Sequence, residues 1–246
     1  MKRENRDAGP ETPWAQRLEA LASRWSLGAD ATRKLAELLV LVRDDPRAAT
    51  SVRAPAEAVH VHVADSLSAL PLLDRVAASG RIADIGSGAG FPGLPIAIAR
   101  MGLRVDLVES GRRKSEFMEG AARALDIDNV TVVNARAEDW ARAEGRERYD
   151  VVLARAVAPL ATLTEYAAPL LATGGALIAW KGERDAQEEH AAAAAANELG
   201  LNPAAVERVR PYPGSRSHNL HLYQKLRPTP PEYPRRPGMA RKHPLG

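Results

Sequence analysis

Residues 84–93 read DIGSGAGFPG, and this stretch decides the fold class of the 246-residue chain. It follows a β-rich run at 81–85 and precedes a helical stretch near 92–101. Glycines let a backbone turn tightly and approach a ligand closely. Pro92 suits the first turn of the helix that follows. The loop therefore predicts a site for a nucleotide-type ligand between a strand and a helix.

The sequence around this loop alternates between β-rich runs and helical stretches. Five strands are predicted at 81–85, 104–109, 129–133, 149–154 and 175–180. Helices are predicted near 92–101, 111–125, 159–171 and 183–199, and two further short strands near 204–210 and 219–225. Such alternation predicts an α/β fold with a doubly wound, mainly parallel sheet of seven strands.

The region before residue 74 has the pattern of helices. Apolar residues recur three and four positions apart in two segments, Trp14, Leu18, Leu21, Ala22 and Trp25, then Leu35, Leu38, Leu39 and Val42. A third helix is predicted over 55–73. On it His62 and Asp65 share a face. Either these two residues form a structural hydrogen bond, or Asp65 and Ser66 close over the cofactor pocket. His60 and His62 point apart on such a helix, so we expect no metal site there.

The glycine loop has two interpretations. Gly88, Gly90 and Gly93 fit the dinucleotide pattern GxGxxG, which would make the protein an NAD(P)-dependent oxidoreductase. The loop also reads Asp-x-Gly-x-Gly-x-Gly, a form typical of S-adenosylmethionine (AdoMet) sites. Asp84 is unfavourable beside a pyrophosphate because like charges repel, and favourable beside a sulfonium and an ammonium group. This chemistry favours AdoMet.

Acidic residues follow the second and third predicted strands. Glu109 ends the second strand, where a carboxylate can hold both hydroxyls of a ribose, in NAD and AdoMet alike. Residues 134–140 follow the third strand, where a backbone N–H and the carboxylate of Glu138 can read the edge of a base. The alternative is that these acids only stabilise the helix N-termini that follow.

The composition excludes several kinds of site. The chain has no cysteine, which rules out disulfides, zinc–thiolate sites, iron–sulfur clusters and a cysteine nucleophile. Its longest apolar runs, such as 38–42, are far too short to span a membrane, and residues 1–11 lack the apolar core of a signal peptide. We therefore expect a cytoplasmic protein that has no metal and no membrane contact. We also expect a monomer.

Positive charge is concentrated in residues 225–246. They hold six basic residues and one acid, a net charge of +5, which leaves −2 for residues 1–224 out of the total of +3. Six prolines in the same segment favour extended chain. An extended basic tail is suited to bind phosphates, and the alternative is a solvated terminus.

Several motifs together resemble one known family. They are residues 84–97 (DIGSGAGFPGLPIA), 136–138 (RAE), 155–160 (RAVAPL), 180–182 (WKG) and 225–238 (KLRPTPPEYPRRPG), with 62–67 (HVADSL) before the sheet. In this order they resemble the RsmG family, also called GidB, of bacterial 16S rRNA guanine-N7 methyltransferases. The resemblance covers about residues 47–246.

The resemblance implies a fold and a reaction. The fold is a class I, Rossmann-like, AdoMet-dependent methyltransferase domain over 74–226, with an N-terminal helical extension at 1–73 and a basic, proline-rich tail at 227–246. The reaction is methyl transfer to N7 of a guanine in the decoding-region loop of 16S rRNA, presented as rRNA or as the small ribosomal subunit. A non-catalytic rRNA-binding assembly factor is the other alternative to an oxidoreductase.

The resemblance also implies site residues. The family's cofactor positions correspond to Gly86, Phe91, Ala137, Glu138 and Arg155, and class I methyltransferases in general add Asp84, Gly88, Gly90 and Glu109. Guanine N7 carries a lone pair and no proton, so the reaction needs alignment rather than a general base. We therefore expect no acid–base dyad, and we expect Arg155 and Lys181 to position the substrate. The candidate RNA contacts are Arg53, Arg112, Arg113, Lys114, Lys181, Arg235 and Arg236.

Overall fold

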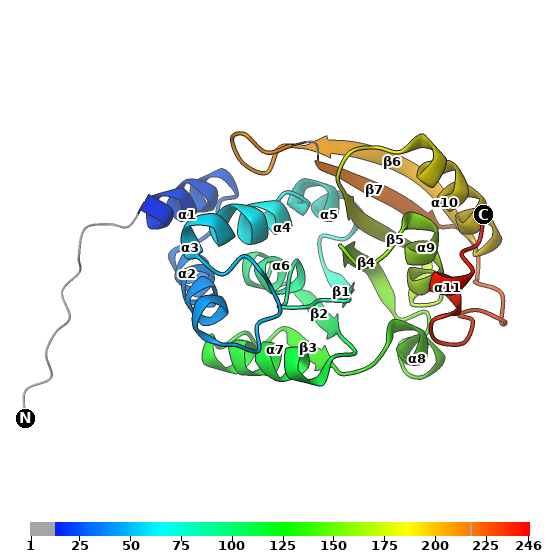
Figure 1. Cartoon of the computed structure of the whole chain (residues 1–246), viewed down its shortest axis with the longest axis horizontal. Helices are drawn as coiled ribbons and strands as arrows, with labels where there is room; N and C mark the ends of the chain where they lie inside the picture. Colours follow the sequence, from blue (N-terminus) through cyan, green and yellow to red (C-terminus); the bar gives the residue numbers. More distant parts are fainter. Residues whose placement is uncertain (1–12, 217) are drawn as a thin grey trace, which may run out of the picture.

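The computed structural model describes residues 13–216 and 218–246, which form a seven-stranded sheet with helices on both faces (Figure 1). The strands are β1 Gly80–Ile85, β2 Leu103–Val108, β3 Val130–Val133, β4 Tyr149–Arg155, β5 Leu171–Lys181, β6 Leu201–Val209 and β7 His218–Lys225. Their order is β3-β2-β1-β4-β5-β7-β6, and only β7 runs antiparallel to its neighbours. The predicted doubly wound, mainly parallel sheet is confirmed.

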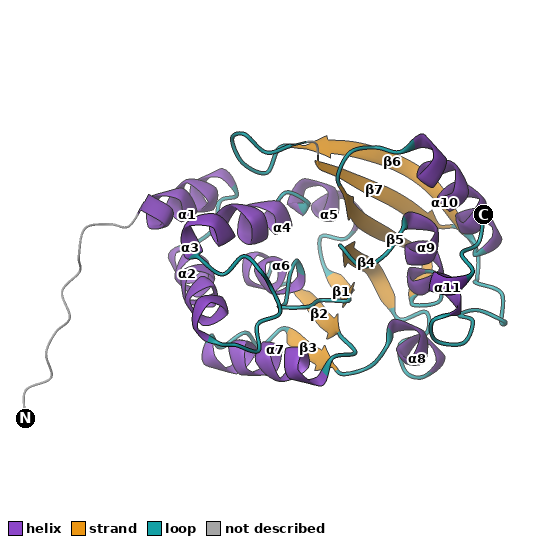
Figure 2. Ribbon diagram, viewed as in Figure 1, coloured by secondary structure: helices purple, strands orange, loops and turns teal. Residues whose placement is uncertain are grey.

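Helices cover the two faces in separate groups (Figure 2). On one face lie α1 Pro13–Arg24, α2 Ala29–Asp44, α3 Pro55–Ala58, the π-helix Val59–Ala64, α4 Asp65–Leu67, α5 Leu70–Val76, α6 Gly93–Ala99 and α7 Arg112–Ala124. On the other lie α8 Ala137–Arg142, α9 Leu160–Ala167, α10 Ala186–Glu198 and α11 Met239–Lys242. Successive side chains of β1 point to opposite faces of the sheet. Ile82 packs against the first group of helices, and Ala83 packs against the second.

The N-terminal helices share a core with the sheet. Leu35, Leu38 and Leu39 of α2 are fully buried in the same apolar cluster as Ile82 of β1 and Val151 of β4. The proposed division at residue 73 falls inside α5, and the helices before it share one apolar cluster with the sheet.

The predicted single helix over 55–73 is interrupted. Residues 59–64 form a π-helix, and a break at 68–69 separates α4 from α5. The hydroxyls of Ser66 and Ser68 donate to the backbone carbonyls of His62 and Asp65, respectively. Such side-chain bonds compete with the regular helical pattern, and π-turns are frequent at functional sites.

The C-terminal segment, residues 227–246, is not the extended, solvated tail that its prolines favour. It packs on α9 and α10 and buries Thr229, Tyr233 and Ala240. Arg235 forms a two-pronged ion pair with the buried carboxylate of Glu165 at 2.5 and 2.9 Å. An ionised carboxylate is costly to bury without a cation, so this pair helps to hold the segment against the domain.

Candidate cofactor and substrate site

The site lies at the carboxyl ends of the central strands, beside the point between β1 and β4 where the strand order reverses. Ligands of open α/β sheets bind at such switch points. A cavity of about 150 Å³ opens there, lined by Ile85, Gly86, Val108, Glu109, Ser110, Ala135, Arg136, Ala137, Glu138, Val157, Tyr166 and Arg241. Ligand pockets usually measure about 300–1,000 Å³, so the cavity suits one part of a ligand, such as a nucleoside.

The glycine loop begins directly at the end of β1. The amide of Gly93 donates to Asp84 Oδ2 at 2.9 Å, and a Cβ on Gly93 would lie 2.2 Å from Leu107, so only glycine fits there. Gly88 has a left-handed φ of +61° and faces open space, because a Cβ there would meet nothing closer than 3.9 Å. The loop therefore leaves room for a ligand beside Gly88.

Asp84 lies behind the loop and not in the cavity lining. Its side chain is fully buried, and Oδ1 has no hydrogen-bond partner among the residues that the structure describes. Burial raises the pKa of Asp84 to about 7, although the Gly93 amide and Arg155 act in the opposite direction. Asp84 is hydrogen-bonded to two residues of the glycine loop, Ser87 and Gly93, and so supports that loop.

Glu109 is held in a fixed orientation at the end of β2. Its carboxylate is 5% exposed, accepts from the Gly88 amide at 3.1 Å and from the Gly111 amide at 2.7 Å, and lines the cavity. Lys114 lies 3.6 Å away. The two amides hold both carboxylate oxygens in place. The predicted carboxylate at the second strand is thus preorganised as an acceptor.

The opposite wall comes from α8 and from the C-terminal segment. Glu138 is buried, and its Oε1 accepts from the Gly238 amide at 3.0 Å. Arg241 of α11 and Tyr166 of α9 also line the cavity. Neither of these two residues was predicted, because Tyr166 lies in an ordinary helical stretch and Arg241 in a segment expected to be extended.

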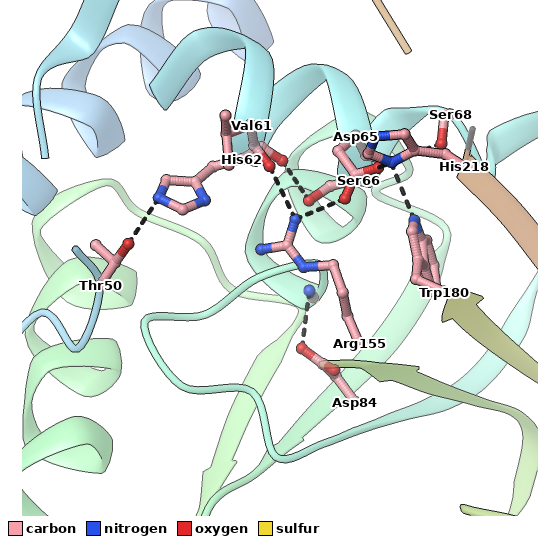
Figure 3. Close-up of polar contacts among 11 residues, drawn as sticks. Thr50, Val61, His62, Asp65, Ser66, Ser68, Asp84, Arg155, Trp180 and His218 are labelled. Carbon is pink, nitrogen blue, oxygen red and sulfur yellow. Dashed lines mark hydrogen bonds and ion pairs between the residues drawn. The ribbon is translucent and has the colours of Figure 1, made fainter. Parts of the chain in front are cut away.

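Arg155 lies at the end of β4, outside the cavity lining, and is held by the N-terminal helices (Figure 3). Its Nη1 donates to the carbonyl of Val61 at 3.1 Å and to Asp65 Oδ2 at 2.9 Å. On the other carboxylate oxygen, Asp65 Oδ1 lies 3.0 Å from His218 Nδ1, and the Trp180 indole donates to the Asp65 carbonyl at 3.1 Å. Asp65 thus joins the helices, β4, β5 and β7.

His62 and Asp65 bond to other residues, so the predicted structural hydrogen bond between them does not form. The His62 ring stacks on Phe91 with centroids 4.5 Å apart, and its Nε2 lies 3.0 Å from Thr50 Oγ1. Burial and the charge of Arg155 lower the pKa of His62 to about 4, so the ring is neutral at pH 7. His60 instead stacks on Tyr212, which confirms that the two histidines point apart.

The candidate RNA contacts differ in their partners. Arg112 pairs with Glu116 at 2.8 Å, Lys181 with Glu188 at 2.7 Å and Arg235 with Glu165 at 2.5 Å. Lys114 lies near Glu109, and Arg53 donates to the carbonyl of Asp45. Arg113 and Arg236 are exposed and have no ion pair within 13–216 and 218–246. Five of the seven candidate cations therefore already have a partner within the protein.

The described residues contain neither a metal-binding cluster nor a membrane-spanning helix. No group of three or more His, Asp or Glu side chains in them could hold a metal ion. No helix in them is long and apolar enough to cross a membrane.

Comparison with known proteins shows the family. The family model described as rRNA small subunit methyltransferase G (GidB) matches residues 32–214. The chain belongs to this family. The ribosomal RNA small subunit methyltransferase G of Roseiflexus castenholzii is 45% identical over 198 residues, which are 80% of this chain and 83% of that protein. The one of Deinococcus deserti is 40% identical over 232 residues, 92% of this chain and 94% of that protein.

A solved structure shows the same fold. The geranyl diphosphate C-methyltransferase of Streptomyces coelicolor superposes with a TM-score of 0.55 at 17% identity, covering 89% of this chain and all of that one. The family resemblance and the class I methyltransferase fold expected from the sequence are confirmed. Membership of a methyltransferase family also decides against the dinucleotide interpretation of the glycine loop.

Proposed function

We propose that this protein transfers a methyl group from AdoMet to N7 of a guanine in the decoding-region loop of 16S rRNA, in the cytoplasm. The observation that carries the proposal is the cavity at the switch point of a GidB-family sheet, with the carboxylate of Glu109 fixed inside it. The identity of the substrate atom rests on the family resemblance.

The residues present fit AdoMet. The open space beside Gly88 admits the amino-acid part of the cofactor, and the fixed carboxylate of Glu109 is placed to accept from ribose hydroxyls. The backbone of Ala137 and the side chain of Glu138 form the wall that would face the adenine. We propose Gly86, Gly90, Phe91 and Asp84 as the residues that shape the loop around it.

When bound, AdoMet would supply an electrophilic methyl group on a sulfonium. The protein's own task is then to orient the acceptor and exclude water, because N7 needs no deprotonation. The stacked rings of Phe91 and His62, with Arg155 5.7 Å from the Phe91 centroid, form a largely buried wall at this edge. We propose that Arg155 positions the guanine, with Asp65 holding the guanidinium in place.

Lys181 is the weaker positioning candidate. Its ammonium pairs with Glu188 at 2.7 Å, and the same carboxylate oxygen accepts from the Leu160 amide at 2.8 Å. Substrate contact by Lys181 would therefore have to compete with this existing pair.

The decisive experiment is transfer of labelled methyl from AdoMet to 16S rRNA. The RNA is offered naked and as small subunits from a strain that lacks the modification, and the product nucleoside is identified. We expect a single 7-methylguanosine. Absence of label on both substrates, with AdoMet bound, would contradict the proposal and favour the assembly-factor alternative.

A further inference from the structure

Five exposed arginines gather at the edge of the sheet that carries the site. They belong to α1 and to the hairpin that joins β6 and β7, and they are Arg17, Arg24, Arg208, Arg210 and Arg216. Asn219 at the start of β7 pairs with Lys181 at the carboxyl end of β5, so the hairpin projects beyond the carboxyl edge. In Figure 1 the hairpin extends over α1, away from α8 and α11.

The hairpin and α1 enclose two adjoining hollows of about 440 and 410 Å³. Arg24, Tyr212 and Pro213 line both, so the hollows form one continuous surface, here called the hairpin groove. Arg17 and His60 line the first hollow, and Arg208 and Arg210 the second. No acidic residue is among the lining residues of either hollow.

The cations of the groove lack acidic partners. Within 13–216 and 218–246, none of the five arginines forms an ion pair. Arg24 donates to the carbonyls of Arg210 and Pro211, which fastens the hairpin to α1. This differs from Arg112, Lys181 and Arg235, whose charges are matched by carboxylates. A surface of unpaired arginines attracts phosphates.

Two aromatic rings complete the groove. His60 and Tyr212 stack in parallel, with centroids 4.7 Å apart and an interplanar angle of 3°. Burial and the nearby charge of Arg17 lower the pKa of His60, so its ring is neutral. Flat rings beside cations are the combination that binds unpaired bases, which stack while their phosphates contact arginine.

The groove is connected to the candidate substrate site. The ring of Tyr212 meets the edge of His218 at 6.3 Å, His218 lies 3.0 Å from Asp65, and Asp65 pairs with Arg155 at 2.9 Å. We infer that the hairpin groove docks unpaired nucleotides of the RNA that flank the modified guanine. This inference rests on the proposed function, and it assigns the RNA contact to residues outside the predicted set.

The test compares two double variants in RNA binding. Arg208→Gln/Arg210→Gln removes two groove cations that make no side-chain contacts in the described residues. Arg104→Gln/Arg123→Gln removes two exposed cations near the amino ends of the strands and serves as the matched control. The probe is a 16S rRNA fragment that contains the decoding-region loop, titrated at several salt concentrations. AdoMet affinity and the thermal midpoint are measured for each protein.

We expect the groove variant to bind the fragment about tenfold more weakly at ~0.15 M salt. The slope of log K against log salt concentration should become shallower by roughly 1.4, because each lost phosphate contact with single-stranded RNA removes about 0.7. The control should bind as the wild type does, and AdoMet affinity should be unchanged in both. Tyr212→Leu, which keeps apolar bulk, should weaken binding at least about fivefold without changing the salt slope.

Equal binding by the groove variant and the control would overturn the inference. Unchanged binding of naked RNA with a loss confined to small subunits would also overturn it, because the groove would then dock a ribosomal protein. Loss of RNA binding by the groove variant supports the inference even if the wild type transfers no methyl group. In that case only the proposed reaction fails.

Discussion

Two buried carboxylates at the ends of β1 and β2 show how position decides the role of a single residue. Glu109 receives two amide hydrogen bonds and faces the cavity, so its charge is available to a ligand. Asp84 is fully buried, and only one of its oxygens accepts a hydrogen bond from an amide. Burial therefore has the largest effect on its pKa and raises it. The same functional group thus faces the cavity in one place and supports the loop in the other.

Glu109→Gln should weaken AdoMet binding by at least about tenfold. An amide has one acceptor oxygen, so its NH₂ group must face one of the two backbone N–H groups that now donate to the carboxylate. Isothermal titration with AdoMet measures the effect. Glu116→Gln, an exposed change on α7, is the control and should bind normally. Affinity within twofold of wild type for Glu109→Gln would contradict the assignment.

Asp84 should also give the protein a characteristic pH dependence. Its pKa is about 7 when folded and about 3.8 when unfolded, so the folded state holds the extra proton between these values. Stability from this group is therefore lost as the pH rises from about 4 to 7, at up to about 1.4 kcal/mol per pH unit. Asp84→Asn removes this dependence.

Urea unfolding of both proteins at pH 5 and pH 8 tests the pH prediction. The stability of wild type relative to Asp84→Asn should be lower at pH 8 than at pH 5. His62 titrates in the opposite direction in both proteins and cancels in the comparison, since its lowered pKa makes stability rise between about pH 4 and 6.5. An equal difference at both pH values would contradict a folded-state pKa near 7 for Asp84.

At the scale of elements, the C-terminal segment is the part whose placement has the largest effect on the site. The Arg235–Glu165 pair and the Gly238–Glu138 bond hold it so that Arg241 reaches the cavity. The segment contains little regular structure, since α11 covers only Met239–Lys242. Its position therefore depends on side-chain bonds and on the burial of Tyr233 and Ala240.

Arg235→Ala should release this segment. Glu165 would be left buried without its partner, which is a costly state, and the wall at Glu138 would loosen. We expect faster cleavage within residues 227–246 in limited proteolysis and several-fold weaker AdoMet binding. The neighbouring Arg236→Ala, at an exposed position, should change neither. Identical digestion of both variants would show that the ion pair does not hold the segment.

The elements differ in how far their sequences predict them. The glycine loop and the seven strands were predictable because period-two apolar runs and glycine spacing are local signals. The π-helix and the docked C-terminal segment were not, since they depend on Ser66 and Ser68 and on a buried partner, Glu165, far along the chain. The hairpin groove was missed for the same reason, because Arg24 and Arg210 are 186 positions apart.

At the scale of the whole molecule, the N-terminal helices and the sheet share one apolar cluster, so we propose that they unfold together. Leu38→Ala should lower the free energy of unfolding by about 2–5 kcal/mol, because Leu38 is fully buried in that cluster. The exposed Leu226, 61% accessible, provides the control change Leu226→Ala, which should have little effect.

Calorimetry would distinguish one cooperative unit from two. We expect a single transition that moves as a whole to lower temperature in Leu38→Ala. A second transition that stays in place would show that the N-terminal extension is an independent domain.

The position of Arg241 in the chain also sets an order of assembly. Ile85, Glu109, Glu138 and Tyr166 all precede it, so during synthesis from the N-terminus the cavity receives its last wall only when α11 has emerged. In a nascent or truncated chain that stops before Gly238, Glu138 lacks its amide donor. The lining of the cavity is therefore complete only after every strand of the sheet has been synthesised.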